Sequence, residues 1–174
     1  MNSDQINSVF FKQPHMKKIN ANLIQEVLQK ANDSPRKRIN YNFHDGDRDP
    51  LQRMLNAMQP GTYLQPHKHE NPDKREVFMA LTGKFVVIQF HDDGTISDYM
   101  ILNPAQMEFA AEVQARTYHT IICLAPNSVI YELKDGPYDP SDDKSFASWA
   151  PKEGAPGCAE YLHRLLTQLN IKMA

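Results

Sequence analysis

The pattern of apolar and polar positions divides the chain at about residue 53. Before this point, residues 19–31 (INANLIQEVLQKA) repeat apolar side chains every three or four positions, which predicts an amphipathic helix. Asn20 or Asn22 is suited to cap its N-terminus. The stretch NDSPRKR follows, and Pro35 ends the helix there. We interpret this stretch as a linker, or as an arm that reaches over the body of the protein.

From residue 53 to residue 134 the pattern changes to short apolar runs separated by turn residues. The runs are RMLNAM, TYLQPH, EVFMALTG, KFVVIQF, ISDYMIL, MEFAAEV, TYHTIICLA and SVIYELK. Asp93-Gly94 predicts a hairpin between two of them, with positive φ at both central residues of the turn. Strands at this spacing predict a mainly β protein with an antiparallel sandwich or barrel.

After residue 134 the sequence becomes rich in Gly, Pro, Asp and Ser, yet it holds Tyr138 and the only tryptophan, Trp149. Large aromatic side chains of this kind predict a segment that wraps back over the barrel. Residues 158–172 then predict an amphipathic C-terminal helix. We therefore divide the single domain into an N-terminal helix and arm (1–52), a barrel core (53–135), and a wrapping loop with the C-terminal helix (136–174).

Composition narrows the classes of function. The 174 residues carry 19 basic and 21 acidic side chains, a formal net charge of -2, which argues against nucleic acid or an anionic membrane as a partner. Two cysteines are too few for a disulfide framework. No run approaches the roughly 20 apolar residues of a membrane span, and the first residues do not resemble a signal peptide. We expect a cytoplasmic protein without membrane insertion.

The candidate chemistry lies in the stretch GTYLQPHKHENPDKREVFMALTG, residues 61–83. Strand alternation would turn His67 and His69 to the same face, and pairing of the next strand with theirs would bring Glu76 opposite them. His119, in a later strand, could supply a third imidazole. The residues alone leave two alternatives open: two exposed histidines in a charged loop, and Glu70 as the carboxylate in place of Glu76.

This stretch resembles the first motif of the cupin superfamily, which is glycine, five residues, His-x-His, three or four residues, glutamate, six residues and glycine. Gly61, His67, His69, Glu76 and Gly83 match it, although six residues separate His69 from Glu76. The stretch VQARTYHTIIC resembles the second motif around His119. There Gln114 replaces the motif's proline, Arg116 its glycine, and Cys123 its usual asparagine.

The resemblance extends to the WbuC-type cupin metalloproteins through QRMLNAMQPGTYLQPHKH, ELKDGPYDP and DKSFASWAPKEG, and it covers most of residues 36 to 166. It implies a jelly-roll barrel, also called a double-stranded β-helix, that binds one metal ion through His67, His69, Glu76 and His119. It also implies an association with bacterial surface polysaccharide (lipopolysaccharide) synthesis. Cupins are often dimers, and the apolar run VFF at residues 9–11 could add a strand to a neighbouring sheet, so we expect a homodimer.

Three imidazoles and one carboxylate suit one divalent transition metal ion, such as Zn, Fe, Mn, Ni or Co, with open positions for a small-molecule substrate. We expect a sugar or nucleotide-sugar isomerase or epimerase, with His44 or Tyr138 moving a proton. Candidate substrate-binding residues are Arg53, Arg38 and Lys134, with Arg36 and Asn40 near the barrel mouth. Two alternatives remain, namely an Fe(II)-dependent dioxygenase and a non-catalytic binding cupin.

Overall fold

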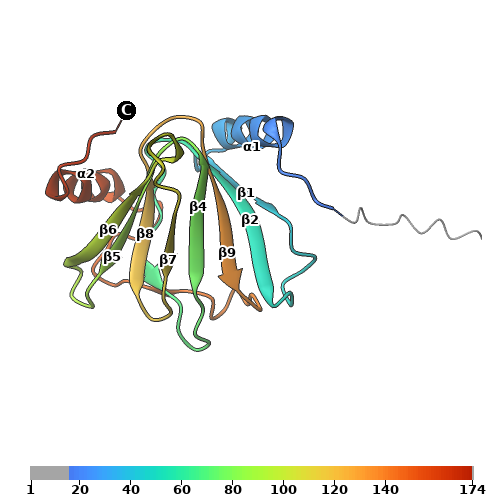
Figure 1. The fold of residues 1–174 in the computed structure, drawn as a ribbon. Helices are drawn as coiled ribbons and strands as arrows, with labels where there is room; N and C mark the ends of the chain where they lie inside the picture. Colours follow the sequence, from blue (N-terminus) through green and yellow to red (C-terminus); the bar gives the residue numbers. More distant parts are fainter. Residues whose placement is uncertain (1–15, 174) are drawn as a thin grey trace, which may run out of the picture.

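The computed structural model describes residues 16–173, and it consists of two antiparallel sheets and two α-helices (Figure 1). The elements are α1 (Ala21–Asp33), β1 (Arg38–Asn42), β2 (Leu51–Met58), β3 (His67–Lys68), β4 (Glu76–Thr82), β5 (Phe85–Phe90), β6 (Ile96–Leu102), the 3-10 helix η1 (Pro104–Gln106), β7 (Ala110–Val113), β8 (Tyr118–Cys123), β9 (Ser128–Asp135), β10 (Ser145–Phe146) and α2 (Cys158–Gln168). The predicted mainly β architecture with a helix at each end is confirmed.

Each sheet has five strands. The first has the order β1-β2-β9-β4-β7 and the second has the order β10-β3-β8-β5-β6. Neighbouring strands within a sheet are often distant in sequence, as β2 and β9 are, because the chain crosses from one sheet to the other, for example between β4 and β5. This pattern is typical of a jelly roll, in which two sheets enclose one interior.

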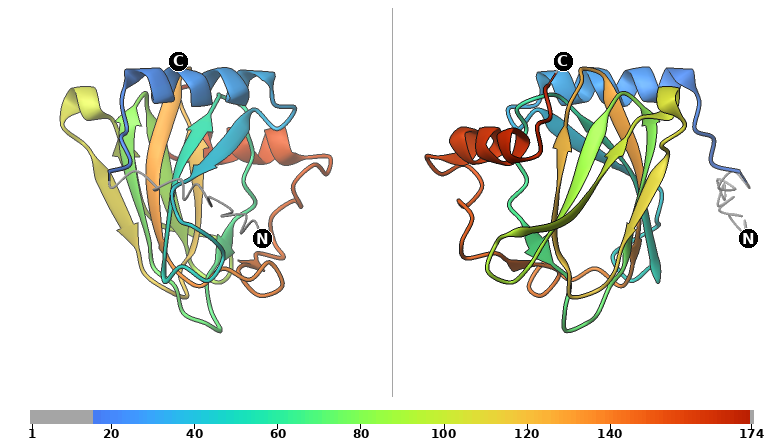
Figure 2. Two further views of the ribbon diagram at one scale, coloured as in Figure 1. Left: turned by 90° about the vertical axis from the view of Figure 1, so that its right-hand side faces the viewer. Right: turned by 60° about the vertical axis from the view of Figure 1, so that its left-hand side comes forward.

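The sheets bury apolar side chains on both faces. Between the sheets lies a cluster that includes Phe78, Phe85, Ile121 and Ile130. On the outer face of the first sheet, α1 packs Val27 and Ala31 against strands β2 and β9. On the outer face of the second sheet, α2 packs against β5 and β8. Figure 2 shows the two helices on these different sides of the barrel, so each helix covers a different sheet.

The helix ends follow the local sequence. The Asn20 side chain accepts a hydrogen bond of 3.1 Å from the Leu23 amide and caps α1, as one of the two predicted candidates. The stretch NDSPRKR after α1, expected to be a linker or arm, leads directly into β1, which pairs along its whole length with β2. The residues from Arg38 onward therefore belong to the edge of the first sheet.

The hairpin between β5 and β6 differs from the predicted turn. Only Gly94 has positive φ, at +87°, and the His91 amide bonds the Thr95 carbonyl across a wider loop. The Asp93 carboxylate accepts from the Thr95 amide and hydroxyl, which stabilises this wider loop. Gly94 also lies against the Trp149 ring, where an added Cβ would come within 2.7 Å. The aromatic segment after residue 134 therefore wraps back over the barrel, as predicted.

Several features bear on the remaining expectations. Both cysteines are free thiols. Among the described residues no helix has the length and apolar character that crossing a bilayer requires.

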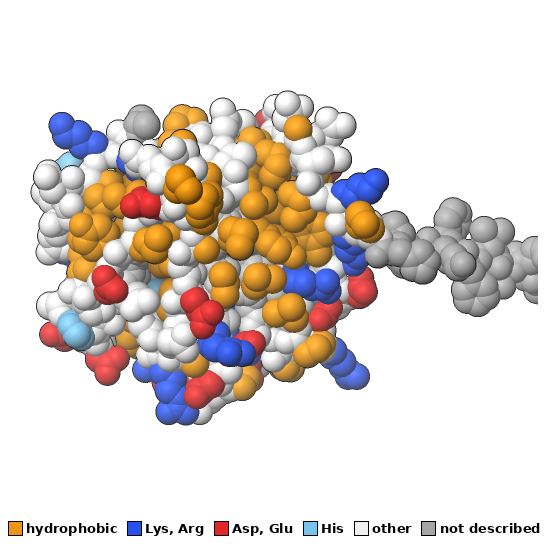
Figure 3. Space-filling model, viewed as in Figure 1, with side chains coloured by type: hydrophobic (Ala, Val, Ile, Leu, Met, Phe, Trp, Pro, Cys, Tyr) orange, Lys and Arg blue, Asp and Glu red, His pale blue; other side chains and the backbone are white. Residues whose placement is uncertain are grey.

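Exposed apolar side chains include Met79, Tyr99, Met107 and Phe109, and Figure 3 shows apolar surface spread over the face seen in Figure 1. The run VFF lies outside the described residues, and the expected homodimer stays a prediction.

Candidate metal centre

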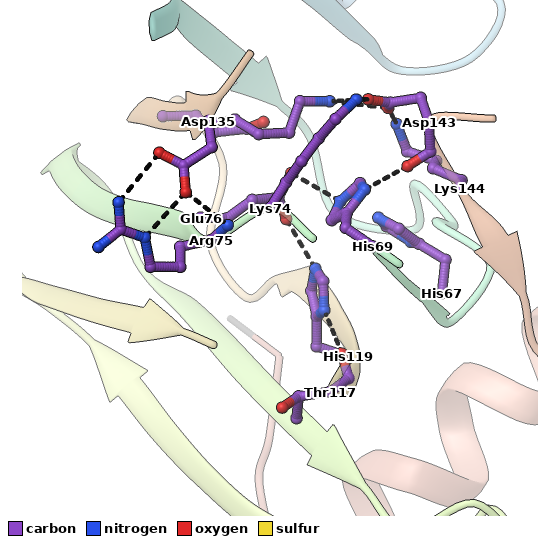
Figure 4. A network of polar contacts seen from close by, with 12 residues as sticks. His67, His69, Lys74, Arg75, Glu76, Thr117, His119, Asp135, Asp143 and Lys144 are labelled. Atoms are coloured by element: carbon purple, nitrogen blue, oxygen red, sulfur yellow. Dashed lines mark hydrogen bonds and ion pairs between the residues drawn. The ribbon is translucent and has the colours of Figure 1, made fainter. Parts of the chain in front are cut away.

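The four predicted ligands meet inside the barrel at one end of the sheets. His67 of β3 pairs directly with His119 of β8, and His69 follows β3. Glu76 begins β4 in the facing sheet. One ligand atom from each of the four lies within 4.8 Å of the others, and all four side chains are buried (Figure 4). The prediction that the strand of Glu76 pairs with the histidine strand is wrong, because Glu76 reaches the histidines across the barrel interior.

The three imidazoles are oriented by the backbone in the same way. The Nδ1 atom of His67 contacts the Gln65 carbonyl at 3.0 Å, and that of His119 contacts the Thr117 carbonyl at 2.9 Å. The Nδ1 atom of His69 contacts the Asp143 carbonyl. A carbonyl can only accept, so each Nδ1 carries the hydrogen and donates it. This leaves the Nε2 lone pair of each ring for a metal ion, the arrangement in which histidine usually binds metals.

The Nε2 atoms converge on the Glu76 carboxylate. His119 Nε2 lies 2.7 Å from one Glu76 oxygen, and His69 Nε2 lies 3.0 Å from the other. The contact of His69 is not aligned as a hydrogen bond, so among the described residues its buried Nε2 has no hydrogen-bond partner. An unpartnered buried nitrogen beside a carboxylate is expected at a site that binds a cation. The four residues therefore fit a divalent metal ion.

The titration behaviour of the site shows how strongly it attracts positive charge. Burial raises the pKa of Glu76, but the facing rings of His119 and His69 outweigh burial and hold this pKa well below the usual value. Burial lowers the pKa of His119, and the Glu76 carboxylate raises it by more. Burial and the neighbouring His119 lower the pKa of His67 well below its usual value. The site thus keeps an ionised carboxylate beside a neutral imidazole, as metal binding requires.

A buried cluster of charged side chains surrounds Asp143, whose backbone carbonyl binds His69. The Asp143 carboxylate binds Lys74 at 3.0 Å, Lys134 at 2.7 Å and Lys144 at 2.8 Å, while the Asp143 carbonyl accepts from His69. Lys74 and Lys134 are almost fully buried. A lysine at such depth needs a charge partner, so the cluster fixes the position of Asp143 and with it the orientation of the His69 ring.

Two of the departures from the cupin motifs, Arg116 and the long loop before Glu76, contact each other. Arg116, which stands where the second motif has glycine, adopts a left-handed conformation with φ of 64°, the conformation that glycine favours. Its amide donates to the His69 carbonyl at 2.9 Å, and its side chain binds Asp73 in the long loop before Glu76. Glu70, the alternative carboxylate, forms an ion pair with Lys68 at 3.0 Å and lies outside the ligand group.

A cavity of about 460 Å³ opens onto the ligands, and His67, Glu76 and His119 line it. This volume lies within the range of small-molecule sites, roughly 300–1,000 Å³. The other lining residues combine charged, amide and apolar groups: Arg36, Arg38, Ile39, Asn40, Asn56, Met58, Leu64, Gln65, Phe78, Ile121, Glu132, Lys144, Phe146 and Glu153. A cavity of this size and polarity suits a small polar molecule.

The structure separates the remaining predicted site residues. Arg38 lines the cavity, whereas Lys134 is buried against Asp143 outside the lining. His44 contacts the Arg53 backbone through Nδ1, and Arg53 pairs with Asp49 at 2.8 Å. Tyr138 packs its ring beneath the Lys134 ammonium. None of His44, Arg53 and Tyr138 lines the cavity, so their assigned roles stay predictions.

Sequence reasoning missed several polar residues of the cavity wall, and Glu132 and Asn56 are two of them. Glu132 of β9 is 9% exposed and receives a hydrogen bond from the Asn56 amide of β2. Burial and the charge of Glu76 raise the pKa of Glu132 to about 7. Among the described residues, the buried Asn56 Oδ1 has no hydrogen-bond partner. The signal was present in the run SVIYELK, where strand alternation puts Ile130, Glu132 and Lys134 on one face.

Comparisons with known proteins agree with this architecture. A family model described as a domain of unknown function, DUF6016, matches residues 19–102, which is slightly under half of the chain and includes three of the four ligands. No curated protein matches the sequence.

Among solved structures, L-ribose isomerase from Cellulomonas parahominis aligns with a TM-score of 0.52 and 14% identity, covering 67% of this chain and 72% of that chain. CapF with the inhibitor 3-isopropenyl-tropolone aligns with a TM-score of 0.51 and 21% identity, covering 63% of this chain. The aligned part is about a third (34%) of the CapF chain. Another structure, titled capsular polysaccharide assembling protein CapF from Staphylococcus aureus, has a TM-score of 0.49 and 19% identity, with 63% of this chain and 31% of that chain covered.

At these identities the likeness shows the fold alone. The L-ribose isomerase and CapF chains are cupin-fold proteins, and the mainly β architecture with two antiparallel sheets described above matches that fold. The protein therefore has the cupin fold, with a buried group of three histidines and one glutamate that could hold a metal ion.

Proposed function

We propose that the protein is a metal-dependent enzyme of the isomerase or epimerase type that acts on a sugar or nucleotide sugar. The observation that carries the proposal is the convergence of three Nε2 lone pairs and an ionised carboxylate on one point at the wall of a polar cavity. The resemblance to WbuC-type cupins in the stretches GPYDP and FASWAP supports bacterial surface polysaccharide synthesis as the setting.

A divalent ion at this point supplies Lewis-acid polarisation of a carbonyl or hydroxyl oxygen. Isomerisation and epimerisation next need a group that removes a proton from the carbon beside a carbonyl and returns it to another position or face. We assign this part to Glu132, because its buried carboxyl lines the cavity, and burial raises its pKa toward the range in which a carboxyl both accepts and donates a proton.

Asn56 completes this arrangement. Its amide nitrogen holds the Glu132 carboxyl, and its unpartnered Oδ1 is an acceptor at the cavity wall. A ligand hydroxyl would satisfy that acceptor, and buried unsatisfied acceptors are otherwise costly. This favours a ligand rich in hydroxyl groups, as a sugar is.

The metal can be tested first. Protein purified without chelators or nickel resin should contain one divalent metal ion per chain by elemental analysis. His67→Ala should lose the metal and keep its fold, while His163→Ala, on the exposed face of α2, serves as the matched control and should keep both. A wild-type preparation that contains no metal and binds none on reconstitution would refute the proposal.

Turnover is tested with sugars and nucleotide sugars in deuterium oxide under anaerobic conditions. The proposed reaction should incorporate deuterium at the carbon beside the carbonyl without consuming oxygen. Oxygen consumption with Fe(II), and no turnover in its absence, would instead identify the dioxygenase alternative. Saturable sugar binding without isotope exchange would identify a binding cupin.

A further inference from the structure

The mouth of the cavity holds two arginines and one glutamate that the proposed reaction does not use. Arg36 and Arg38 lie at the start of the first sheet's edge, and Glu153 lies in the segment that leads to α2. Arg38 Nη2 contacts both Glu153 oxygens at 2.6 Å, and Arg36 Nε contacts one of them at 3.0 Å. Two guanidinium groups therefore share one carboxylate at the entrance.

Arg38 is held in place independently of Glu153. Its Nη1 donates to the Thr62 hydroxyl at 3.1 Å and to the Tyr63 carbonyl at 2.9 Å. The side chain is only 9% exposed, so its charge needs a partner at all times. When Glu153 moves away, the Arg38 guanidinium stays aimed at the same point and requires another anion there.

Glu153 is held much less firmly. Its side chain is 39% exposed, and among the described residues its polar side-chain contacts are with Arg36 and Arg38. It lies in the sequence APKEGAPG, where Gly154 has positive φ and no atom lies within 4 Å of the position of its missing Cβ. The exposed Glu153 side chain therefore has room to turn away without disturbing the core.

We infer that the arginine pair is the binding site for an anionic group of the ligand, and that Glu153 occupies this site when the ligand is absent. The group is a carboxylate or a phosphate, which arginine binds with the same geometry. The inference rests on the proposed function, since it takes the occupant of the cavity to be a sugar. The substrate class is thereby narrowed to acidic or phosphorylated sugars, with the anionic end at the mouth and the hydroxyl groups toward Asn56 and the metal ligands.

The ligand anion takes over the charge-assisted hydrogen bonds that Glu153 gives up, and the exposed Glu153 carboxylate returns to water, so displacement of Glu153 reduces the gain from the arginines without cancelling it. A neutral sugar gains nothing at the mouth because Glu153 stays in place. The arginine pair therefore contributes selectivity between anionic and neutral sugars of similar size.

Three probes that share one sugar ring test this inference: glucuronate, glucose 1-phosphate and the neutral methyl glucoside. Binding to the full chain is measured by calorimetry or NMR titration. Glu153→Gln, which removes the competing charge, should raise affinity for an anionic probe about tenfold and leave methyl glucoside unchanged. Arg36→Gln should lower affinity for the anionic probe about tenfold.

Arg36 is chosen because it is 64% exposed, whereas a change at the buried Arg38 risks misfolding. Asp135→Asn, which breaks an exposed ion pair with Arg75 elsewhere on the surface, is the matched control and should change neither affinity. A gain confined to glucuronate assigns a carboxylate, and a gain confined to glucose 1-phosphate assigns a phosphate. Equal affinity for all three probes, no binding of either anionic probe, or no effect of Glu153→Gln would overturn the inference.

The same titrations on metal-free protein separate this inference from the proposed function. The arginines do not belong to the metal-ligand group, so the preference for an anionic probe should persist without metal. A protein that discriminates anionic from neutral sugars but holds no metal would refute the proposed function and leave the anion site standing.

Discussion

The two halves of the barrel interior are built on the same strands but have opposite chemistry. Along β4 the inward positions run from Glu76 to Phe78 and Ala80, and along β8 they run from His119 to Ile121 and Cys123. In both strands a polar position opens the strand and two apolar positions follow. One half of the interior therefore packs as a core, and the other half forms the site.

The contrast shows how buried polar side chains are stabilised inside a barrel. The apolar half, with Phe85, Val87 and Ile130, supplies the burial that stabilises the two sheets. The polar half is stabilised by partners at each step: carbonyls for the imidazoles, Asn56 for Glu132, and lysines for Asp143. Changes in the first half should act on stability, and changes in the second half on binding and catalysis.

The largest effect is expected from the apolar half. Phe85→Ala removes a fully buried side chain between the sheets and should lower the free energy of unfolding by about 3–5 kcal/mol. Denaturant unfolding measures this loss. The protein that remains folded should bind metal with unchanged stoichiometry. Loss of metal binding in the folded fraction would show that the two halves are not separable in this way.

The pH dependence of stability should reveal Glu132. In metal-free protein its pKa is about 7, above the ordinary value of 4.5, so the folded state holds this proton more strongly than the unfolded state. The contribution of Glu132 to stability is therefore fully present below about pH 4.5 and is lost as pH rises through 7, by at most about 3 kcal/mol. Glu132→Gln should remove this decline in the free energy of unfolding between pH 4.5 and about pH 7. A variant with the wild-type profile would contradict the raised pKa.

Catalysis should depend on the same carboxyl. Glu132→Gln keeps the shape of the side chain but cannot take up a proton, so kcat should fall about 100-fold, or about 2.7 kcal/mol. Metal content, measured in parallel, should stay at the wild-type value. A matched change at the surface, Glu112→Gln, should leave kcat unaltered. Equal kcat for both variants would remove Glu132 from the proposed reaction.

A smaller effect is expected from the support behind His69. Lys74→Met removes one of three ammonium groups on Asp143 and loosens the carbonyl that orients the His69 ring. Metal affinity should fall about tenfold, as is usual when a ligand loses its supporting hydrogen bonds. Lys30→Met, in an exposed pair on α1, is the control for the loss of a lysine. Competition with a chromogenic chelator measures both, and unchanged affinity in Lys74→Met would show that the cluster serves folding alone.

The smallest effect should come from outside both halves. Asp135→Asn breaks an exposed ion pair with Arg75, and such pairs contribute less than about 1 kcal/mol. Thermal unfolding should place this variant close to the wild type. A larger change would mean that the strand end of β9 influences the site.

Most of the strands and the four clustered residues were predictable because they depend on local rules. Alternation places side chains on faces, turn residues mark strand ends, and the spacing of the histidines matches a known motif. The separation of His67 and Glu76 into facing sheets was not predictable, because strand pairing joins segments distant in sequence. The same reason hid β1, whose five residues form a strand only beside β2.

The cavity residues were harder still. Glu132 and Asn56 lie on different strands and become a pair only in the folded barrel, while Arg38 and Glu153 are separated by more than a hundred positions. His44 and Tyr138 were chosen for their chemistry, and nothing in their local sequence indicates whether they face the cavity. Local pattern thus identifies ligands that share a motif, and it misses partners that only the tertiary fold brings together.

The short strand β10 has a consequence for how the protein is made. It pairs with β3 on the side away from β8, and the adjoining Asp143 provides the acceptor for His69. During synthesis the first three ligands leave the ribosome long before this segment does. We expect the nascent chain to hold metal weakly until residues 143–146 have docked, so that a chain ending after Asp135 would contain all four ligands and still lack a finished site.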